Sequence, residues 1–315
     1  MDEFNAAKLL YDVLQGQGES SPSPERLKAK YAQILRGMPV EDEFGLLARW
    51  SGQCHLVHKL DAEVFVRPEG YQIPDYLCVV DRENGRRPFL VAVTSSVKRS
   101  KTFSKKWVLA LEEYGAMLGL PVLVAFKWTT PSHPLWALTE LERVRTERGT
   151  AKLDVLEMMK EDLFGLLFGF FSFQIRQGAG IVVKITKERV ESETRFVGRL
   201  TDLHWQTPEG QRAEVPSILN DLFLLCDDEV VIEDTSSNLV QRFLKVADDS
   251  TMVHWALPIA VDFSAFLKGE QPKWRLARSS TFRFTLPELR DAVYQATGVI
   301  DHTLTIHPHH VPTWL

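Results

Sequence analysis

The chain has 315 residues, of which 44% are hydrophobic and 25% are charged. This length and composition allow a sizeable core, in one large domain or two of ordinary size, and they exclude global disorder. The formal net charge is -5 at pH 7. The chain as a whole is therefore not a basic nucleic-acid binder, and a surface for phosphate would be a local patch.

The sequence excludes several further classes of protein. The three cysteines, Cys54, Cys78 and Cys226, are far apart and form no CxxC pair, so we expect reduced core thiols and no cysteine-based zinc site. The N-terminal residues carry early acids and no basic segment before an apolar one, which argues against a signal peptide. The longest apolar stretch, 163–173, is too short to span a bilayer. We expect a soluble, cytoplasmic protein with no membrane partner.

The first predicted elements along the chain are helices. Amphipathic spacing predicts short helices over 3–15 and 25–36. A third helix is predicted over 40–50, where acidic residues in the first turn suit the positive end of the helix dipole. Short strands are expected to follow at 53–58 and 62–66.

The next segment alternates strands with one helix. Residues 73–81 (IPDYLCVVD) and 89–96 (FLVAVTSS) are predicted strands, and the second is apolar almost throughout, as in a strand buried on both faces. A helix over 103–118 is predicted to end at Gly119, and a strand follows at 121–127. This order of strand, helix and strand predicts a right-handed parallel crossover.

The second half of the chain shows a different pattern. Residues 140–149 are predicted as a solvated helix, and 153–166 as a helix that leads into a phenylalanine-rich strand. Strands and short turns follow, with one further helix near 216–225, which indicates an α+β arrangement of hairpins. We therefore expect a first domain over 1–150 and an α+β accessory domain over 151–315. The phenylalanines are interpreted as a domain core or a subunit interface rather than a base-stacking platform: Phe164, Phe168, Phe170, Phe171 and Phe173.

The pattern that bears most on function lies in residues 71–128. Asp75 follows Pro74 at the start of one apolar run, a second run ends in small polar residues, and a helix leads into a third run. Residues 41–128 resemble the PD-(D/E)XK, or restriction-endonuclease-like, nuclease superfamily. The resemblance implies an α/β core with a mixed sheet flanked by helices, and Mg²⁺-dependent cleavage of nucleic-acid phosphodiesters.

The resemblance also implies roles for individual residues. Asp75 would be the first acid that binds the metal, and Glu43, or else Glu41, would be the helix glutamate that completes the metal shell. Ala92 stands where the family places its second acid, and Thr94 stands where it places a lysine. Alanine cannot bind a cation and threonine carries no charge, so the motif is degenerate. Apart from the resemblance, Asp75 is equally explained as a turn-capping aspartate, and Glu43 as a first-turn helix residue.

Three functional alternatives follow from this degenerate motif. In the first, the protein is an active Mg²⁺-dependent endonuclease subunit of a defence, restriction or repair system; Asp75 and Glu43 hold the metal, and Lys98 replaces the missing lysine. In the second, the core has lost catalysis and is a docking surface for nucleic acid or protein. In the third, the chain is a scaffold that contacts only a protein partner or a second copy through its C-terminal half. Other lysines available for the first alternative are Lys101, Lys105 and Lys106.

A basic segment coincides with the motif. No acidic residue occurs between Asn84 and Leu111, although the chain is acidic overall. Positive side chains beside the motif would meet a phosphate backbone, most simply that of DNA. The residues predicted to contact nucleic acid are Arg86, Arg87, Lys98, Arg99, Lys101, Lys105 and Lys106. The other interpretation is a solvated loop whose charge is balanced by acids nearby in space.

Overall fold

The structure is a computed structural model, and it describes residues 40–60, 71–83, 85–130, 134–192, 195–223, 228–245, 250–261 and 281–315. The helices expected over 3–15 and 25–36 and the strand expected over 62–66 lie outside these residues. By their contacts, the described residues fall into two compact units. The first unit contains residues 40–170, 260–286 and 305–315, and the second contains 171–259 and 287–304, in each case as far as they are described.

The division between the units falls after Phe170, later than the boundary at 150 that the sequence suggested. The residues between these positions include strand β7 (Ala151–Asp154), which pairs with strand β4 (Ser100–Phe103) of the first unit. Their backbone therefore belongs with the first half of the chain. The organisation into two domains, 1–150 and 151–315, stays a prediction.

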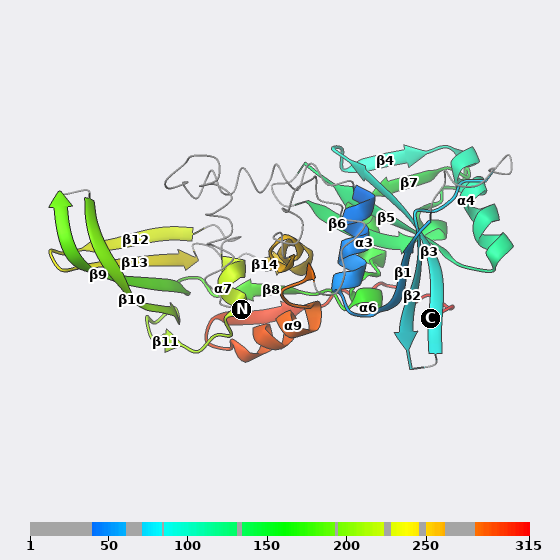
Figure 1. Ribbon diagram of the computed structural model, residues 1–315. Helices are drawn as coiled ribbons and strands as arrows, with labels where there is room; N and C mark the ends of the chain where they lie inside the picture. Colours follow the sequence, from blue (N-terminus) through cyan, green and yellow to red (C-terminus); the bar gives the residue numbers. More distant parts are fainter. Residues whose placement is uncertain are drawn as a thin grey trace. The chain divides into compact units, whose positions relative to one another are not determined.

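A five-stranded mixed sheet forms the centre of the first unit. Its first three strands, β1 (Cys54–Lys59), β2 (Tyr76–Arg82) and β3 (Gly85–Ser96), form an antiparallel meander. Strand β5 (Val122–Trp128) runs parallel to β3, and β6 (Leu135–Glu140) returns antiparallel to β5. The predicted parallel pairing across a helix is confirmed, and the helices flank this sheet (Figure 1).

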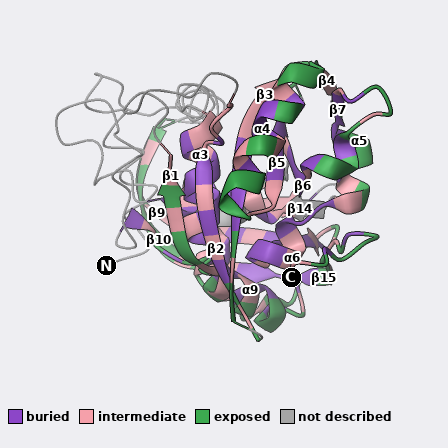
Figure 2. Cartoon of the chain, turned by 90° about the vertical axis from the view of Figure 1, so that its right-hand side faces the viewer, coloured by how far each residue is buried: buried purple, intermediate pink, exposed green. Residues whose placement is uncertain are grey.

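The crossover helix α4 (Lys105–Leu118) connects β3 to β5 by way of β4. The side chain of Ser104 caps its start by accepting the Trp107 N–H, and Gly119 ends it in the left-handed conformation with φ 65°. The helix begins later than the predicted position 103 because Ser100–Phe103 pair with β7. Figure 2 shows that exposed residues lie along the outer side of α4.

Helix α3 (Val40–Trp50) matches the predicted third helix, and an aromatic cluster holds it against the sheet. The buried ring of Phe44 contacts the rings of Tyr76, Trp136, Phe164 and Phe168, with centroids 5.5–6.3 Å apart. Aromatic pairs at this separation add to the free energy gained by burying the rings. The cluster fixes the acidic first turn of α3 relative to β1 and β2.

The predicted helix over 153–166 is confirmed only in part, because the structure divides it into short helical segments. The chain instead forms β7, helix α5 (Val155–Met158), the 3-10 turn η2 (Met159–Glu161) and helix α6 (Phe164–Phe168). Asp154 sets the start of α5 as its N-cap, because its carboxylate accepts the Leu156 N–H at 3.2 Å. Asp162 lies between η2 and α6, and its carboxylate accepts the Leu138 N–H of β6 at 2.8 Å. The second half of the predicted phenylalanine-rich strand is confirmed as β8 (Ser172–Ile175).

The predicted solvated helix over 140–149 is wrong. Its only helical turn in the described chain is η1 (Leu141–Val144), in which Leu141 and Val144 are buried. These two side chains pack into the core beneath α4, so the segment follows the sheet rather than the solvent. All five phenylalanines between 164 and 173 are buried within the chain, which supports their interpretation as core residues.

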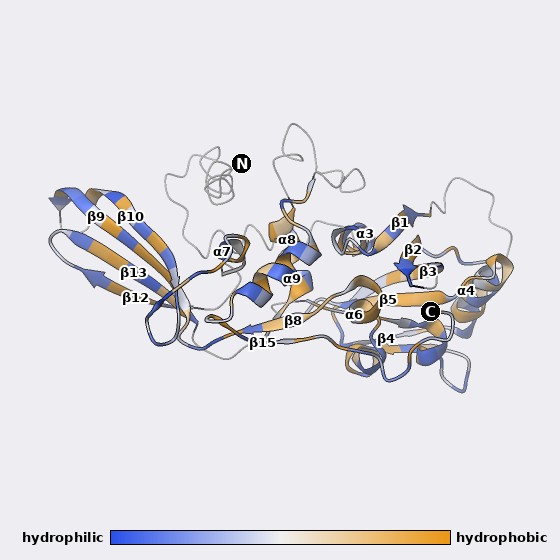
Figure 3. Ribbon diagram, turned by 90° about the horizontal axis from the view of Figure 1, so that it is seen from below, coloured by the Kyte–Doolittle hydropathy of each residue, from blue (hydrophilic) through white to orange (hydrophobic). Residues whose placement is uncertain are grey.

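The second unit is built on a five-stranded antiparallel sheet. Its strands lie in the order β11 (Arg212–Ala213), β10 (Arg195–Gln206), β9 (Gly180–Ser192), β13 (Asn238–Lys245) and β12 (Asp228–Asp234). The strands alternate polar and apolar residues, as Figure 3 shows. The predicted hairpin pattern is thus present, while the role of this unit in contacting a partner stays a prediction.

The remaining elements of the second unit are a three-stranded sheet and short helices. The sheet has the order β14 (Ser250–Met252), β8 and β15 (Ile300–Leu304), all antiparallel. The helices are α7 (Ile218–Phe223), the 3-10 turn η3 (Val253–Ala256), α8 (Leu257–Ala260), which ends at the division between the units, and α9 (Leu286–Gln295).

In the described parts of the chain, the longest apolar helices fall short of what a membrane crossing requires.

The contacts of Phe44 generate a stability prediction. Phe44→Ala leaves a cavity among four aromatic rings, so we expect it to lower the free energy of unfolding by about 3–5 kcal/mol. The matched truncation Met117→Ala, at a residue of α4 that is 58% exposed, should change it by less than about 0.5 kcal/mol. Urea unfolding of the full chain measures both values, and equal losses for the two variants would contradict the packing described.

Candidate functional site

Asp75 lies immediately before β2 and is held against β3 by its backbone and its side chain. Its N–H donates to the Val91 carbonyl at 2.9 Å, and its Oδ2 accepts the Val93 N–H at 2.6 Å. The carboxylate therefore lies beside the stretch of β3 that contains Ala92 and precedes Thr94. The two segments of the motif, IPDYL and FLVAV, lie side by side as the sequence suggested.

The environment of Asp75 favours its neutral form. Burial is the main cause and raises the pKa of this carboxyl to about 6. The Val93 N–H opposes that shift, the negative charge of Glu41 adds to it, and the positive charge of Lys59 opposes it. A carboxyl with this pKa is charged at neutral pH but gives up its proton less readily than an exposed aspartate.

Glu41, rather than Glu43, is the α3 glutamate whose charge acts on Asp75. Glu41 and its neighbour Asp42 share the Lys59 amine, with Oε2 and Oδ1 at 3.0 and 2.6 Å from Nζ. Burial lowers the pKa of Lys59, but the hydrogen bonds and charges of the two acids outweigh burial and raise it. This arrangement leaves Lys59 charged and Glu41 paired with it.

Glu43 is engaged elsewhere in the structure. One of its carboxylate oxygens forms an ion pair with the Lys127 amine of β5, and the other accepts the Trp136 Nε1–H of β6 at 3.1 Å. The Glu43 and Lys127 side chains are only 12% and 8% exposed. Both oxygens of the predicted metal ligand thus serve to join α3 to the sheet. The sequence showed Lys127 only as a cation near a strand end.

The amine of a lysine donates a hydrogen bond to the side chain of Thr94. Lys101, which belongs to β4, donates from Nζ to Thr94 Oγ1 at 2.7 Å and to the Ser95 carbonyl at 3.3 Å. The amine also lies 4.9 Å from the centre of the Phe103 ring, and burial lowers its pKa. An ammonium group therefore occupies the neighbourhood in which the resemblance places a strand lysine. Lys98, the residue chosen from the sequence, lies in an exposed bend.

The structure separates the basic residues into two groups. Arg86 and Arg87 lie at the start of β3, where they contact Asp81 at 3.5 Å and the Leu315 carbonyl at 3.3 Å. The other predicted contacts follow the end of β3, roughly 30 Å away at 3.3 Å per residue. We call this second group the linker cluster: Lys98, Arg99, Lys101, Lys105 and Lys106. The structure does not bring the seven residues together on one surface.

The linker cluster retains most of its positive charge. Arg99 pairs with Asp154 at 3.3 Å, with the arginine side chain 56% exposed. Lys98, Lys105 and Lys106 are exposed, and no acidic residue lies in the first turn of α4. Within the described residues Arg99 is the member of the cluster that forms an ion pair, so the four lysines keep this end of β3 positive.

The donors near Asp75 do not fit a complete magnesium site. Magnesium prefers several oxygen ligands in octahedral geometry, but Ala92 supplies none and both oxygens of Glu43 are already bonded. Within the described residues, no group of three or more His, Cys, Asp or Glu side chains is close enough to hold a metal ion. We therefore derive no chemical step through a bound metal.

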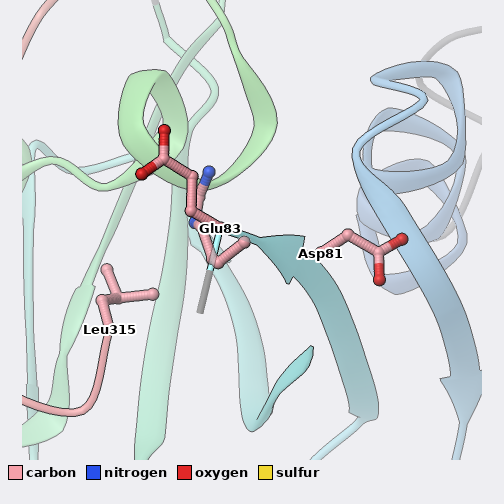
Figure 4. A pocket seen from close by; sticks show the side chains of 4 residues that line it. Asp81, Glu83 and Leu315 are labelled. Atoms are coloured by element: carbon pink, nitrogen blue, oxygen red, sulfur yellow. The ribbon is translucent and has the colours of Figure 1, made fainter. Parts of the chain in front are cut away.

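The described surface also contains a hollow of about 490 Å³ at the opposite end of β2 from Asp75. Asp81, Arg82, Glu83 and Leu315 line it, and Figure 4 draws these side chains and labels Asp81, Glu83 and Leu315. Arg82 donates to the Leu166 carbonyl, which fixes the guanidinium at this end of the strand. The hollow is too far along β2 to belong to the Asp75 site.

Comparison with known proteins finds likenesses among solved structures and none by sequence. No protein-family model matches the sequence, and no curated protein matches it. Among solved structures, the chain is similar to Hjc, a Holliday junction resolvase from the archaeal hyperthermophile Archaeoglobus fulgidus, at 18% sequence identity and a TM-score of 0.25. The likeness covers 32% of this chain and 79% of that chain. At this TM-score it carries no argument about function.

The raised pKa of Asp75 predicts that replacing this aspartate stabilises the protein, by an amount that depends on pH. The pKa of Asp75 is about 6 in the folded state, above its ordinary value of 3.8. Between these two pH values the folded state binds more protons than the unfolded state, so the free energy of unfolding falls as the pH rises. Asp75→Asn should therefore raise the free energy of unfolding by about 1–3 kcal/mol at neutral pH and leave it unchanged in acid. Urea unfolding across this pH range measures the gain, and a pH-independent effect would contradict the assigned cause.

The buried ion pair predicts a strong coupling between α3 and β5. Lys127→Met leaves the Glu43 carboxylate buried without its cation, so we expect a loss of about 3–5 kcal/mol in the free energy of unfolding. Adding Glu43→Gln removes the orphaned charge and keeps an acceptor for Trp136, so the double variant should recover more than half of that loss. A double-mutant cycle by urea unfolding tests this, and additive losses would refute the coupling.

Proposed function

We propose that the first unit is a restriction-endonuclease-like core that binds nucleic acid, DNA first, without cleaving it. The observation that carries this proposal is the hydrogen bond from the amine of Lys101, a member of the linker cluster, to Thr94 of β3. In this proposal the amine and its neighbours hold phosphate groups instead of activating water.

The charge and backbone geometry of the linker cluster support phosphate binding. Its side chains follow the end of β3 and lead into the first turn of α4, which contains Lys105 and Lys106 and no acid. Phosphate contacts of this kind neutralise the nucleic-acid backbone and release its counterions. They do not depend on base sequence, so the proposed binding is sequence-independent.

The lack of cleavage follows from the groups around Asp75. One carboxylate with a raised pKa remains, its partner position is Ala92, and the helix glutamate Glu43 is bound to Lys127 and Trp136. A phosphodiester needs charge stabilisation on both sides of the reacting phosphorus, which this set lacks. The protein would act in the cytoplasm within a defence, restriction or repair system, with the second unit contacting a protein partner or a second copy.

Magnesium-dependent cleavage is a second candidate, because one observation favours it. The Lys101 amine reaches Thr94, the position of the family's lysine, and burial lowers its pKa toward the range useful for moving protons. In that case Asp75 and Lys101, rather than Lys98, would be the reacting pair. A binding assay and a cleavage assay on the same protein preparation distinguish the two candidates.

Binding is measured by fluorescence anisotropy of a labelled DNA duplex at increasing salt. We expect the logarithm of the affinity to fall with log salt by about 0.9 per phosphate contact. Lys98→Ala, Lys105→Ala and Lys106→Ala should each reduce that slope by about 1. The control Lys160→Ala removes a 54% exposed lysine paired with Glu157 and should leave the slope unchanged. Equal effects of the control and the cluster variants would contradict the proposal.

Cleavage is measured by nicking of supercoiled plasmid with Mg²⁺ or Mn²⁺. The proposal predicts that the native chain and Asp75→Ala give the same background. Nicking by the native chain that falls by about 100-fold or more in both Asp75→Ala and Lys101→Met would overturn the non-cleaving proposal and establish the second candidate.

A further inference from the structure

Two aromatic side chains stack on each other beside the linker cluster. The ring centroids of Phe103 in β4 and Trp107 in the first turn of α4 are 4.0 Å apart, and the ring planes are inclined by 23°. The cap of α4 fixes Trp107, because its N–H donates to the Ser104 side chain. Both side chains pack against the core beneath α4, and both remain partly exposed. Aromatic surface therefore extends from the core to the solvent at this point.

A lysine amine lies against this aromatic pair. Lys101 and Phe103 are two residues apart on β4 and so share one face of that strand. The Lys101 amine is 4.9 Å from the centre of the Phe103 ring, within the range of a cation–π contact. The same amine donates to Thr94, which holds it near the end of β3. An ammonium group and an aromatic surface are thus adjacent and fixed relative to each other.

Hydrogen bonds also hold the backbone between β3 and β4 in place. The Val97 carbonyl accepts the Trp128 Nε1–H of β5 at 3.2 Å, and the Ser96 hydroxyl accepts the Lys98 N–H at 2.9 Å. The Thr129 N–H donates to the Ser96 carbonyl at 3.0 Å. A segment that is already fixed loses little conformational entropy when it binds a ligand. The exposed lysine of this segment is therefore presented on an ordered backbone.

A nucleotide presents the two groups that this surface can bind. Its phosphate is negative, its base has an aromatic face, and one sugar joins the two. Proteins that bind single-stranded nucleic acid combine positive side chains along the backbone with aromatic rings on which bases stack. The bases of a duplex are already stacked on one another, so a duplex offers the linker cluster its phosphates but no free base. The aromatic pair therefore adds affinity for a single strand and none for a duplex.

We propose that the linker cluster binds single-stranded DNA, with an unpaired base stacked on the Phe103–Trp107 pair and the adjoining phosphates held by the neighbouring lysines. This inference rests on the proposed nucleic-acid binding and specifies the substrate class of that same surface. Stacking accepts every base, because each base has an aromatic face. Binding of a single strand thus stays independent of base sequence.

The first test uses the native chain and three labelled probes of equal length. Fluorescence anisotropy measures the dissociation constants for a single-stranded oligonucleotide, for the corresponding duplex, and for an abasic strand that keeps the phosphates and lacks the bases. We expect the single strand to bind about 10-fold or more tightly than the abasic strand, because only the former can stack. It should also bind more tightly than the duplex at high salt, which weakens the phosphate contacts.

The second test replaces the two rings. Phe103→Leu and Trp107→Leu keep an apolar side chain against the core and remove the aromatic face. Each should weaken binding of the single strand about 5-fold or more and leave binding of the abasic strand unchanged. The control Tyr294→Leu removes an aromatic side chain of α9 that is 55% exposed, and it should change neither affinity. A variant that fails to fold is recognised because it loses both probes.

The native chain decides the matter without any variant. Equal affinities for the single strand and the abasic strand would overturn this proposal and leave nucleic-acid binding through phosphates intact. Equal losses in the ring variants and in Tyr294→Leu would also overturn it. Binding of none of the three probes would overturn both this proposal and the proposed function. The two failures are distinguishable, because the abasic strand reports the phosphate contacts alone.

Discussion

The buried ion pair between Glu43 and Lys127 is the interaction on which the arrangement of the first unit depends. It joins α3 to β5, while the second oxygen of Glu43 holds Trp136 of β6. Breaking one side of such a pair leaves a charge without a partner in a poorly solvated place, which costs several kcal/mol. The pair therefore fixes the helix relative to the sheet, and it engages Glu43, which the sequence suggested as a metal ligand. One contact thus determines both the packing and the chemistry that remains.

The charged side chains around β3 have other partners and positions than the motif implied. Asp75 stays against the strand, but its burial favours the neutral form, and Lys59 is divided between Glu41 and Asp42. The positive charge that the motif lacks at Thr94 comes from Lys101, one short strand later in the chain. Together with the exposed Lys98 and the two lysines in the first turn of α4, it produces a cationic end of the sheet beside a single carboxyl. Such a surface is suited to holding a polyanion.

The local sequence pattern was sufficient to predict those elements in which the spacing of apolar residues is typical of a helix or a strand. The helix over 40–50, the continuously apolar β3 and the stop at Gly119 all followed from it. The role of Lys127 did not, because Glu43 lies 84 positions away in the chain and only the folded sheet brings them together. The broken helix after 153 depends in the same way on Asp162, whose carboxylate bonds to β6. The pairing of β4 with β7 placed Lys101, rather than Lys98, at Thr94.

The central proposal is that the first unit binds nucleic acid and has no metal site at Asp75. Isothermal titration calorimetry of Mn²⁺ into the full chain tests this most directly, with Asp75→Ala as the comparison. The account predicts that the two proteins give the same weak, unsaturable heats. A saturable site in the native chain that disappears in Asp75→Ala would contradict it.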